Sequence, residues 1–315
     1  MIRVAIQGEL GAYSECAALD FFLGQDVKIV PCRDYSDLFD AMDAGLADCM
    51  IIPIENSSAG SVYPYYDLLL DYAIERGFRI TSERKLRIRH NLIACQGAKL
   101  ADIREVWSHV QAIDQCRNFL RTHKLVGKAG YDTAGAVKDI VKLGRHDVAA
   151  IASVQAAVDL GMEILDRDIQ DNRDNYTRFL KVEREAVAKP DYEISKTSVV
   201  FCIANVQGSL FNALAAFGTR TNVSIIRAES RPLIGTFTKW RKFARKHREG
   251  EDVGVWDLLY YLDFVAPTVK CPFVIEHLHD FVLKQDGDSA LQVLGSYNAE
   301  IPLRDITGEP WRQNI

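Results

Sequence analysis

The sequence predicts an α/β protein with a two-lobed domain, followed by a smaller ferredoxin-like α+β domain. Three observations predict this fold class. Short apolar runs alternate with helical segments up to residue 182, and the alternation restarts once near residue 105. A charged segment containing Lys189-Pro190 then interrupts the pattern. Beyond it the order becomes strand–helix–strand–strand–helix–strand, which is the split βαβ pattern.

The first lobe is predicted from strands and helices that alternate along residues 2–93. Gly24 closes the first helix, as a glycine just past a helix C-terminus does. The run at 47–54 is continuously apolar, which is typical of a parallel strand covered on both faces. The predicted elements are strand 2–7, helix 14–23, strand 27–30, a helix capped by Asp34 or Ser36 and ending near 45, strand 47–54, helix 61–73 and extended segments within 78–93.

The second lobe repeats the alternation. Asp132 or Thr133 and Ser153 precede helical segments and fit the N-cap position. The predicted elements are strand 105–108, helix 112–121, strand 125–129, a helix ending at 143, strand 148–151, helix 153–160 and strand 177–182. Two successive runs of strand–helix units predict two lobes with a cleft between them.

The pattern sets the expected boundaries at 1–183 for the two-lobed domain, 184–195 for a linker, 196–300 for the smaller domain and 301–315 for a tail. Pro272 stands at the first position of a helix, where its missing N–H costs nothing. An insertion at 233–257 is longer than a strand–strand connection usually is. The smaller domain is predicted from strand 197–203, helix 209–217, strands 223–229 and 258–264, helix 272–284 and strand 291–297.

Charge and composition narrow the classes of function. The 38 Lys and Arg against 43 Asp and Glu give a net charge of −5, which argues against nucleic acid as the main partner. A hydrophobic content of 48% excludes a disordered chain. The insertion carries six basic residues within 239–248. For this cluster a solvated amphipathic face is favoured over an oligomer contact, and nucleic-acid binding ranks last.

The seven cysteines are odd in number and widely spaced, and none forms a Cys-x-x-Cys pair. This pattern indicates structural thiols in a reducing compartment rather than disulfides or a zinc site. His277 and His279 lack a third metal ligand. A strand begins at Ile2 and no apolar run approaches membrane-spanning length. We therefore expect a cytoplasmic protein with no membrane or metal partner.

Polar side chains follow the predicted strands, at the edge where open α/β sheets bind ligands. Most are neutral hydrogen-bonding groups and several open a helix, where free N–H groups attract anions. Gly8 and Gly11 do not form a dinucleotide fingerprint. The residues alone therefore predict a cleft suited to a carboxylate, formed by segments 7–14, 55–60, 108–111, 132–134 and 175–179.

Five motifs in these segments give the chain a specific resemblance. Gly8-x-x-Gly11-x-Tyr13-Ser14-Glu15, Pro53-Ile54-Glu55-Asn56-Ser57, Ser108-His109-x-Gln111-Ala112, Asp132-Thr133-Ala134 and Asn175-x-Thr177-Arg178-Phe179 stand in the order of the prephenate dehydratases. The smaller domain resembles the regulatory ACT domain of that family, with Gly208-Ser209-Leu210-Phe211 and Glu229-Ser230-Arg231-Pro232. The resemblance implies a catalytic domain of periplasmic-binding-protein type II architecture.

The resemblance implies a carbon–oxygen lyase of L-phenylalanine biosynthesis that converts prephenate to phenylpyruvate, water and carbon dioxide without a cofactor. It implies L-phenylalanine as a feedback effector and a homodimer or homotetramer. Thr177 is the expected donor to the leaving hydroxyl, with Glu55 or His109 as proton source. The cleft is expected to be locally positive. The expected substrate-binding residues are Ser14, Asn56, Ser57, Ser108, Gln111, Thr133, Arg178 and Phe179, and the expected effector-binding residues are Gly208, Ser209, Leu210, Glu229, Ser230, Arg231 and Pro232.

The chain departs from the family pattern in two places. Val110 replaces the usual proline, and Gln207 and Ser209 replace proline and alanine in the ACT motif. Two alternatives to a prephenate dehydratase stay open. One is an arogenate dehydratase, which takes the aminated substrate on the same scaffold. The other is a non-catalytic sensor with a solute-binding cleft, against which the intact Asn175–Phe179 motif argues.

Overall fold

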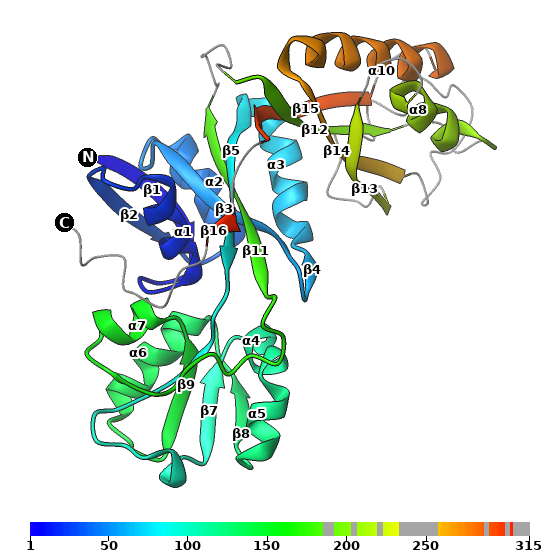
Figure 1. Ribbon diagram of the computed structural model, residues 1–315. Coiled ribbons are helices and arrows are strands. Elements are labelled where there is room, and N and C mark those ends of the chain that lie inside the picture. The colour runs from blue at the N-terminus through cyan, green and yellow to red at the C-terminus, as the bar shows by residue number, and fades with distance from the viewer. Residues whose placement is uncertain are drawn as a thin grey trace, which may run out of the picture. The chain divides into compact units, whose positions relative to one another are not determined.

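The structure is a computed structural model, and it describes residues 1–184, 192–202, 207–218, 223–232, 258–286, 290–299 and 303–304 (Figure 1). It contains two compact units. One comprises residues 1–65, 84–181 and 302–315, and the other residues 66–83 and 182–301. Most of the predicted linker, the whole insertion with its basic cluster, and nearly all of the predicted tail lie outside the described residues.

The first lobe is built on a sheet of order β16-β5-β11-β3-β1-β2, with β4 paired to β3. The strands β2 and β3 both run parallel to β1, as the continuously apolar run of β3 predicts. Its core gathers apolar residues of β1, α1 and β3. The elements are β1 Ile2–Gln7, α1 Tyr13–Phe21, β2 Val27–Cys32, α2 Tyr35–Asp43, β3 Cys49–Asn56, β4 Gly60–Ser61, β5 Phe78–Arg87, β11 Tyr176–Arg184 and β16 Leu303–Arg304. The helix α3 Tyr63–Arg76 and the first part of β5 fall largely within residues 66–83 of the second compact unit.

The second lobe is a sheet of order β10-β6-β9-β7-β8 with helices on both faces. The helix predicted at 112–121 is two helices, because Cys116 leaves the helical conformation with φ −119° and ψ 23°. The strand β10 has no counterpart in the prediction. The elements are β6 Asn91–Ala94, the short 3-10 helix η1 Leu100–Asp102, β7 Glu105–Ser108, α4 Val110–Gln115, α5 Arg117–Thr122, β8 Val126–Ala129, α6 Thr133–Leu143, β9 Val148–Ala152, α7 Val154–Asp159 and β10 Glu163–Asp166.

The chain crosses between the two lobes twice, through residues 88–90 and 167–175. These crossing segments are hydrogen-bonded to each other, from Ile88 N to Asn175 O at 2.8 Å and from Ile169 N to His90 O at 2.9 Å. The lobes also meet at Gly11, where φ is +92° and an added Cβ would lie 2.7 Å from the Cα of Ala156. Only glycine fits this approach, which brings the start of α1 against the second lobe.

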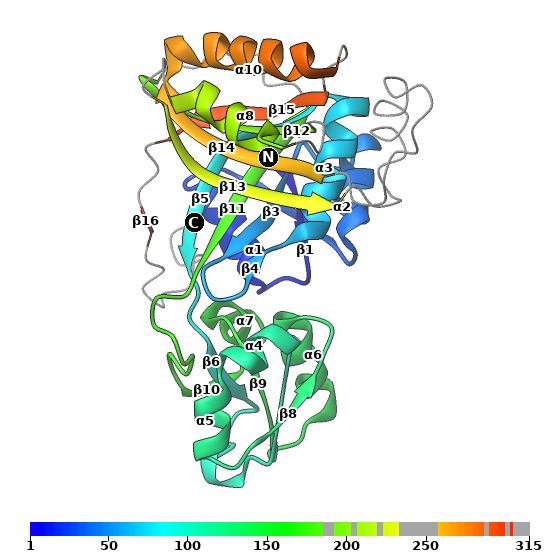
Figure 2. The ribbon, with the colours of Figure 1, turned by 90° about the vertical axis from the view of Figure 1, so that its right-hand side faces the viewer.

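The second compact unit contains an antiparallel sheet of order β13-β14-β12-β15. The helices α8 and α10 lie on one face of this sheet (Figure 2) and bury its core, which is the ferredoxin-like arrangement that the sequence predicts. Residues 66–83 cluster with this unit, and the order of elements along the chain did not predict that. The elements are β12 Ile194–Cys202, α8 Ser209–Gly218, β13 Ser224–Pro232, β14 Leu258–Pro267, η2 Thr268–Lys270, α10 Cys271–Asp286 and β15 Ala290–Asn298.

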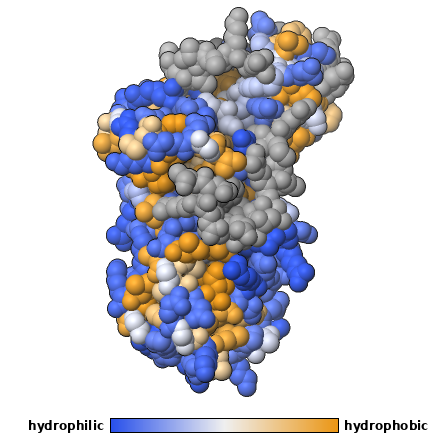
Figure 3. Space-filling view, turned by 60° about the vertical axis from the view of Figure 1, so that its left-hand side comes forward, coloured by the Kyte–Doolittle hydropathy of each residue, from blue (hydrophilic) through white to orange (hydrophobic). Residues whose placement is uncertain are grey.

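The surface of the second lobe mixes apolar and polar side chains, as the lower part of Figure 3 shows. Val141, Leu143 and Val158 are exposed there on α6 and α7. Scattered exposed apolar residues of this kind are ordinary on protein surfaces. Among the described residues, no helix combines the length and the apolar character that crossing a membrane requires.

Candidate active site

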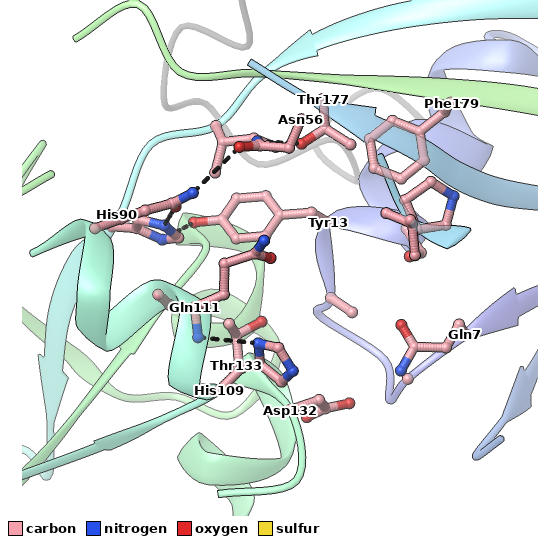
Figure 4. Close-up of a pocket in the computed structure, with 18 of the residues that line it drawn as sticks. Gln7, Tyr13, Asn56, His90, His109, Gln111, Asp132, Thr133, Thr177 and Phe179 are labelled. Atoms are coloured by element: carbon pink, nitrogen blue, oxygen red, sulfur yellow. Dashed lines mark hydrogen bonds between the residues drawn. The ribbon is translucent and has the colours of Figure 1, made fainter. Parts of the chain in front are cut away.

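A cavity of about 160 Å³ lies between the two lobes of the first compact unit (Figure 4). Strand ends, helix starts and the first crossing segment all contribute side chains to its wall. Seven of the predicted site residues line it, and these are Ser14, Asn56, His109, Gln111, Thr133, Thr177 and Phe179. The other residues of the wall are Gln7, Gly8, Ala12, Tyr13, Tyr35, Pro53, Val62, Ile88, His90, Ala112, Gln115 and Asp132.

Two helices of the wall begin at the cavity. Tyr13 and Ser14 form the start of α1, and Thr133 begins α6. The first N–H groups of a helix have no partner within the helix, and the helix dipole favours negative charge there. The start of α1, which has no side-chain cap, therefore offers neutral hydrogen-bond donors to an anion, whereas the Asp132 carboxylate already caps α6.

Thr177 and Asn56 form the best-defined polar pair in the wall. The side-chain oxygen of Asn56 accepts the backbone N–H groups of Ser58 at 2.9 Å and Ala59 at 3.0 Å. Its Nδ2 therefore faces Thr177 and donates to Oγ1 at 2.9 Å. Because Oγ1 already accepts this bond, the hydrogen of the Thr177 hydroxyl is available to the cavity.

Arg178 and Glu55, two of the predicted site residues, lie apart from this wall. Successive side chains of a strand point to opposite faces, so Arg178 faces away from the side that Thr177 and Phe179 share. It is nearly buried and forms an ion pair with Glu55, with 3.6 Å between Nη1 and Oε2. Their roles in carboxylate binding and proton supply stay predictions.

Ser57 and Ser108 do not line the cavity but make hydrogen bonds between the strands that surround it. Ser57 Oγ donates to Asp174 O and accepts from Tyr176 N, both at 2.9 Å, so it ties the end of β3 to β11. Ser108 is fully buried, and its Oγ donates to Ile151 O at 2.6 Å across β7 and β9. Neither contact tests a role in substrate binding.

The predicted effector residues lie in the second compact unit. Gly208 precedes α8 with φ +86°, Ser209 begins that helix, and Leu210 is exposed on it. On β13, Glu229 pairs with Arg227 and Arg231 pairs with Asp67 of α3, while Ser230 and Pro232 stand beside them. Effector binding at these residues stays a prediction.

The sequence analysis did not single out Tyr13, His90, Gln115 and Asp132 as site residues, although all four line the cavity. Gln115 follows Gln111 by four residues, and this helical spacing could have placed both on one face. Asp132 was placed in the predicted cleft with segment 132–134 and considered as a helix cap, without a chemical role, and it does cap α6 by accepting from Gly135 N. No sequence signal separates His90 from the extended residues around it.

The charge of the cavity differs from the expected locally positive cleft. Among the described residues that line it, none is Lys or Arg. Arg178, which was predicted to bind a carboxylate there, lies on the other face of β11. Asp132 is the one carboxylate in this wall. Burial raises the pKa of Asp132, and N–H groups of Gly135 and Glu9 partly oppose this. Burial also lowers the pKa of His109, against the attraction of Asp132.

His90 gives the fold a measurable dependence on pH. Burial lowers its pKa from 6.5 to about 4, although a hydrogen bond to Gln115 opposes the shift. Because the pKa of His90 is lower in the folded state than in the unfolded state, only the unfolded state takes up the proton between pH 6.5 and 4. The free energy of unfolding is therefore unaffected by His90 above pH 6.5 and falls as the pH drops toward 4. The loss amounts to about 3 kcal/mol.

His90→Gln, which cannot take up this proton, is expected to lose about 3 kcal/mol less stability than the wild type between pH 7 and 4. Denaturant unfolding at both pH values measures the difference, with the exposed His146→Gln as control. Equal losses in the wild type and His90→Gln would contradict the assignment.

Comparison with known proteins identifies the family. The family model described as prephenate dehydratase matches residues 4–187. The chain belongs to the prephenate dehydratase family. Arogenate dehydratase/prephenate dehydratase 2, a chloroplastic protein of Arabidopsis thaliana, is 40% identical over 300 residues, which cover 94% of this chain and 72% of the relative. Arogenate dehydratase 2 of Petunia hybrida is 39% identical and is covered to 72%, with 95% of this chain matched.

A solved prephenate dehydratase has the same fold. The crystal structure from Arthrobacter aurescens, in complex with L-Phe, gives a TM-score of 0.77 at 25% identity and covers 98% of this chain and 92% of its own. The predicted two-lobed α/β class is thereby confirmed. The predicted enzyme class is confirmed as well, because the family consists of lyase-type dehydratases of aromatic amino-acid biosynthesis.

The predicted cytoplasmic location is wrong. Arogenate dehydratase/prephenate dehydratases 1 and 2 of Arabidopsis thaliana are chloroplastic proteins by name, and this finding overturns the prediction. The prediction rested on reduced cysteines and on a strand that begins at Ile2. Reduced thiols do not distinguish one reducing compartment from another. A strand at the start of the prephenate dehydratase domain gives no information about subcellular location.

Proposed function

We propose that the chain catalyses the decarboxylative dehydration of arogenate to L-phenylalanine, and that it converts prephenate to phenylpyruvate more slowly. The names of the relatives from Arabidopsis and Petunia support a dehydratase of this substrate pair. The observation that carries the preference for arogenate is the buried carboxylate of Asp132 in a cavity wall without Lys or Arg.

The reaction needs donors more than it needs a base. The ring carboxylate leaves as carbon dioxide, the electron pair of the broken C–C bond moves into the ring, and the ring hydroxyl departs with a proton as water. Thr177 donates to this departing hydroxyl, because Asn56 holds its oxygen and leaves its hydrogen to the cavity. The start of α1, which has no side-chain cap, holds the substrate's negative charge. His109 is the proposed source of the proton.

Asp132 favours the aminated substrate. Prephenate brings two carboxylates and no cation, so the negative charge of Asp132 opposes its binding. Arogenate carries an ammonium group on its side chain, which can pair with Asp132. In a buried cavity such a charge-assisted pair is worth about 1.5–3 kcal/mol. The positive charge of the ammonium group would also lower the pKa of Asp132, against the rise that burial causes.

L-Phenylalanine is the proposed effector, and the second compact unit is its proposed site. The solved prephenate dehydratase from Arthrobacter holds L-Phe by its title, and the residues around Gly208 and Glu229 match the effector motifs of an ACT domain. The ferredoxin-like sheet of this unit supports that assignment. We further propose a homodimer or homotetramer.

Steady-state kinetics with each substrate tests the preference. We expect kcat/KM for arogenate to exceed that for prephenate about tenfold, and millimolar L-phenylalanine to slow both reactions. Equal or reversed preference would contradict the role given to Asp132. Rates that do not change with L-phenylalanine would remove the effector proposal and leave the catalytic one standing.

A further inference from the structure

His90 is buried beside the cavity, outside the residues to which the reaction assigns a role. Its side chain is 2% exposed and comes from the first crossing segment between the lobes. Nε2 lies 2.8 Å from Gln115 Oε1, and Nδ1 lies 3.0 Å from the hydroxyl of Tyr13. Figure 4 shows His90 and Tyr13 joined at one side of the cavity.

The hydrogen on His90 can be located from the backbone. Two backbone N–H groups fix the side-chain oxygen of Asn56, as described above. That oxygen also accepts from Gln115 Nε2 at 3.2 Å, so the amide nitrogen of Gln115 faces Asn56. Gln115 Oε1 then faces His90 and Asn175, and Asn175 Nδ2 donates to it at 2.9 Å. A carbonyl oxygen has no hydrogen to donate, so Nε2 of His90 must carry one. In the neutral ring Nδ1 is then an acceptor, and the Tyr13 hydroxyl shares its hydrogen between Nδ1 and the carbonyl oxygen of Arg89, which lies 2.6 Å away.

This orientation decides what Gln115 presents to the cavity. Its amide nitrogen has two hydrogens, of which one goes to Asn56. The second is left for the cavity that Gln115 lines. If Nε2 of His90 lacked a hydrogen, Gln115 would gain by turning its nitrogen toward the ring, and its carbonyl oxygen would then face the anionic substrate.

We propose that His90 is a positioning residue, whose Nε2–H holds Gln115 with its second amide hydrogen toward a carboxylate of the substrate. The proposal rests on the proposed function for the identity of that substrate. Because Gln115 meets the substrate before any bond breaks, its loss weakens ground-state binding and raises KM more than it lowers kcat. Burial lowers the pKa of His90 to about 4, so near pH 7 the ring is neutral and carries one hydrogen.

Two substitutions at one position separate this role from simple packing. His90→Gln can place an amide N–H near the position of Nε2, whereas His90→Asn reaches only the position of Nδ1. We expect KM to rise about tenfold in His90→Asn and to stay within about threefold of the wild type in His90→Gln, with kcat little changed in both. Equal losses in the two variants would overturn the proposal.

A double-variant cycle tests whether His90 acts through Gln115. In a Gln115→Met background, His90→Asn is expected to raise KM no further, because the amide that it orients is gone. Additive effects would overturn the proposal. Asn91→Ala is the matched control, since Asn91 follows His90 at the start of β6, is equally buried, and donates to Arg89 O and Ala152 O but not to Gln115. It should leave KM unchanged.

A measurement without substrate keeps the inference apart from the proposed function. Nitrogen-15 NMR of the wild-type imidazole is expected to show the hydrogen of His90 on Nε2. A hydrogen on Nδ1 would overturn the inference whether or not the protein has activity. A wild type that converts neither arogenate nor prephenate would overturn the proposed function, and the NMR result would still decide the role of His90 toward Gln115.

Discussion

Thr177→Val is expected to lower kcat about a hundredfold or more while leaving KM and the unfolding midpoint close to those of the wild type. Valine keeps the β-branched shape but has no hydroxyl. The hydrogen that Thr177 offers to the cavity is therefore lost, while packing beside Asn56 is kept. A donor that acts on the departing hydroxyl acts mainly in the transition state, so its removal should appear in kcat.

Thr177→Ser is the matched control for this prediction, because it restores the hydroxyl on a smaller side chain. We expect it to retain kcat within about tenfold of the wild type. Circular dichroism and denaturant unfolding check that both variants fold. Near-normal turnover in Thr177→Val would remove Thr177 from the mechanism.

Asp132→Asn is expected to reverse the preference between substrates, with a change of about a hundredfold in the ratio of kcat/KM for arogenate to that for prephenate. The substitution removes the partner of the ammonium group and the repulsion toward the dianion. Asparagine is a good helix cap, so α6 should keep its N-terminus. Competition between both substrates in one reaction measures the ratio directly.

Glu9→Gln is the charge-matched control for Asp132→Asn. Glu9 pairs with Lys138 at 2.6 Å near Asp132, but its side chain does not line the cavity. The control therefore removes one negative charge nearby without touching the substrate. A similar change of ratio in both variants would mean that the general charge, and not Asp132, sets the preference.

The fold was predictable where local pattern decides it. Alternating strands and helices identified both lobes and the ferredoxin-like order, because each element has its own periodicity. The break at Cys116 was not predictable, since the residues on both sides favour helix. The association of residues 66–83 with the second compact unit depends on long-range pairs such as Asp67 with Arg231, which no local pattern encodes.

The candidate site was predictable as a set of motifs but not as a geometry. The motifs placed Thr177 and Asn56 in one site, and the structure brings them to 2.9 Å. Strand periodicity puts Thr177 and Arg178 on opposite faces, but the sequence does not say which face meets the cavity. The contact of His90 with Gln115 joins residues from two elements, so it emerges only from the folded structure.

The central claim is that this cavity converts arogenate or prephenate by losing carbon dioxide and water together. The most direct test is to incubate the purified protein with each substrate and quantify carbon dioxide against phenylalanine or phenylpyruvate. The account predicts one carbon dioxide for each product molecule, formed faster from arogenate and lost in Thr177→Val. No product from either substrate, with a folded wild-type protein, would contradict it.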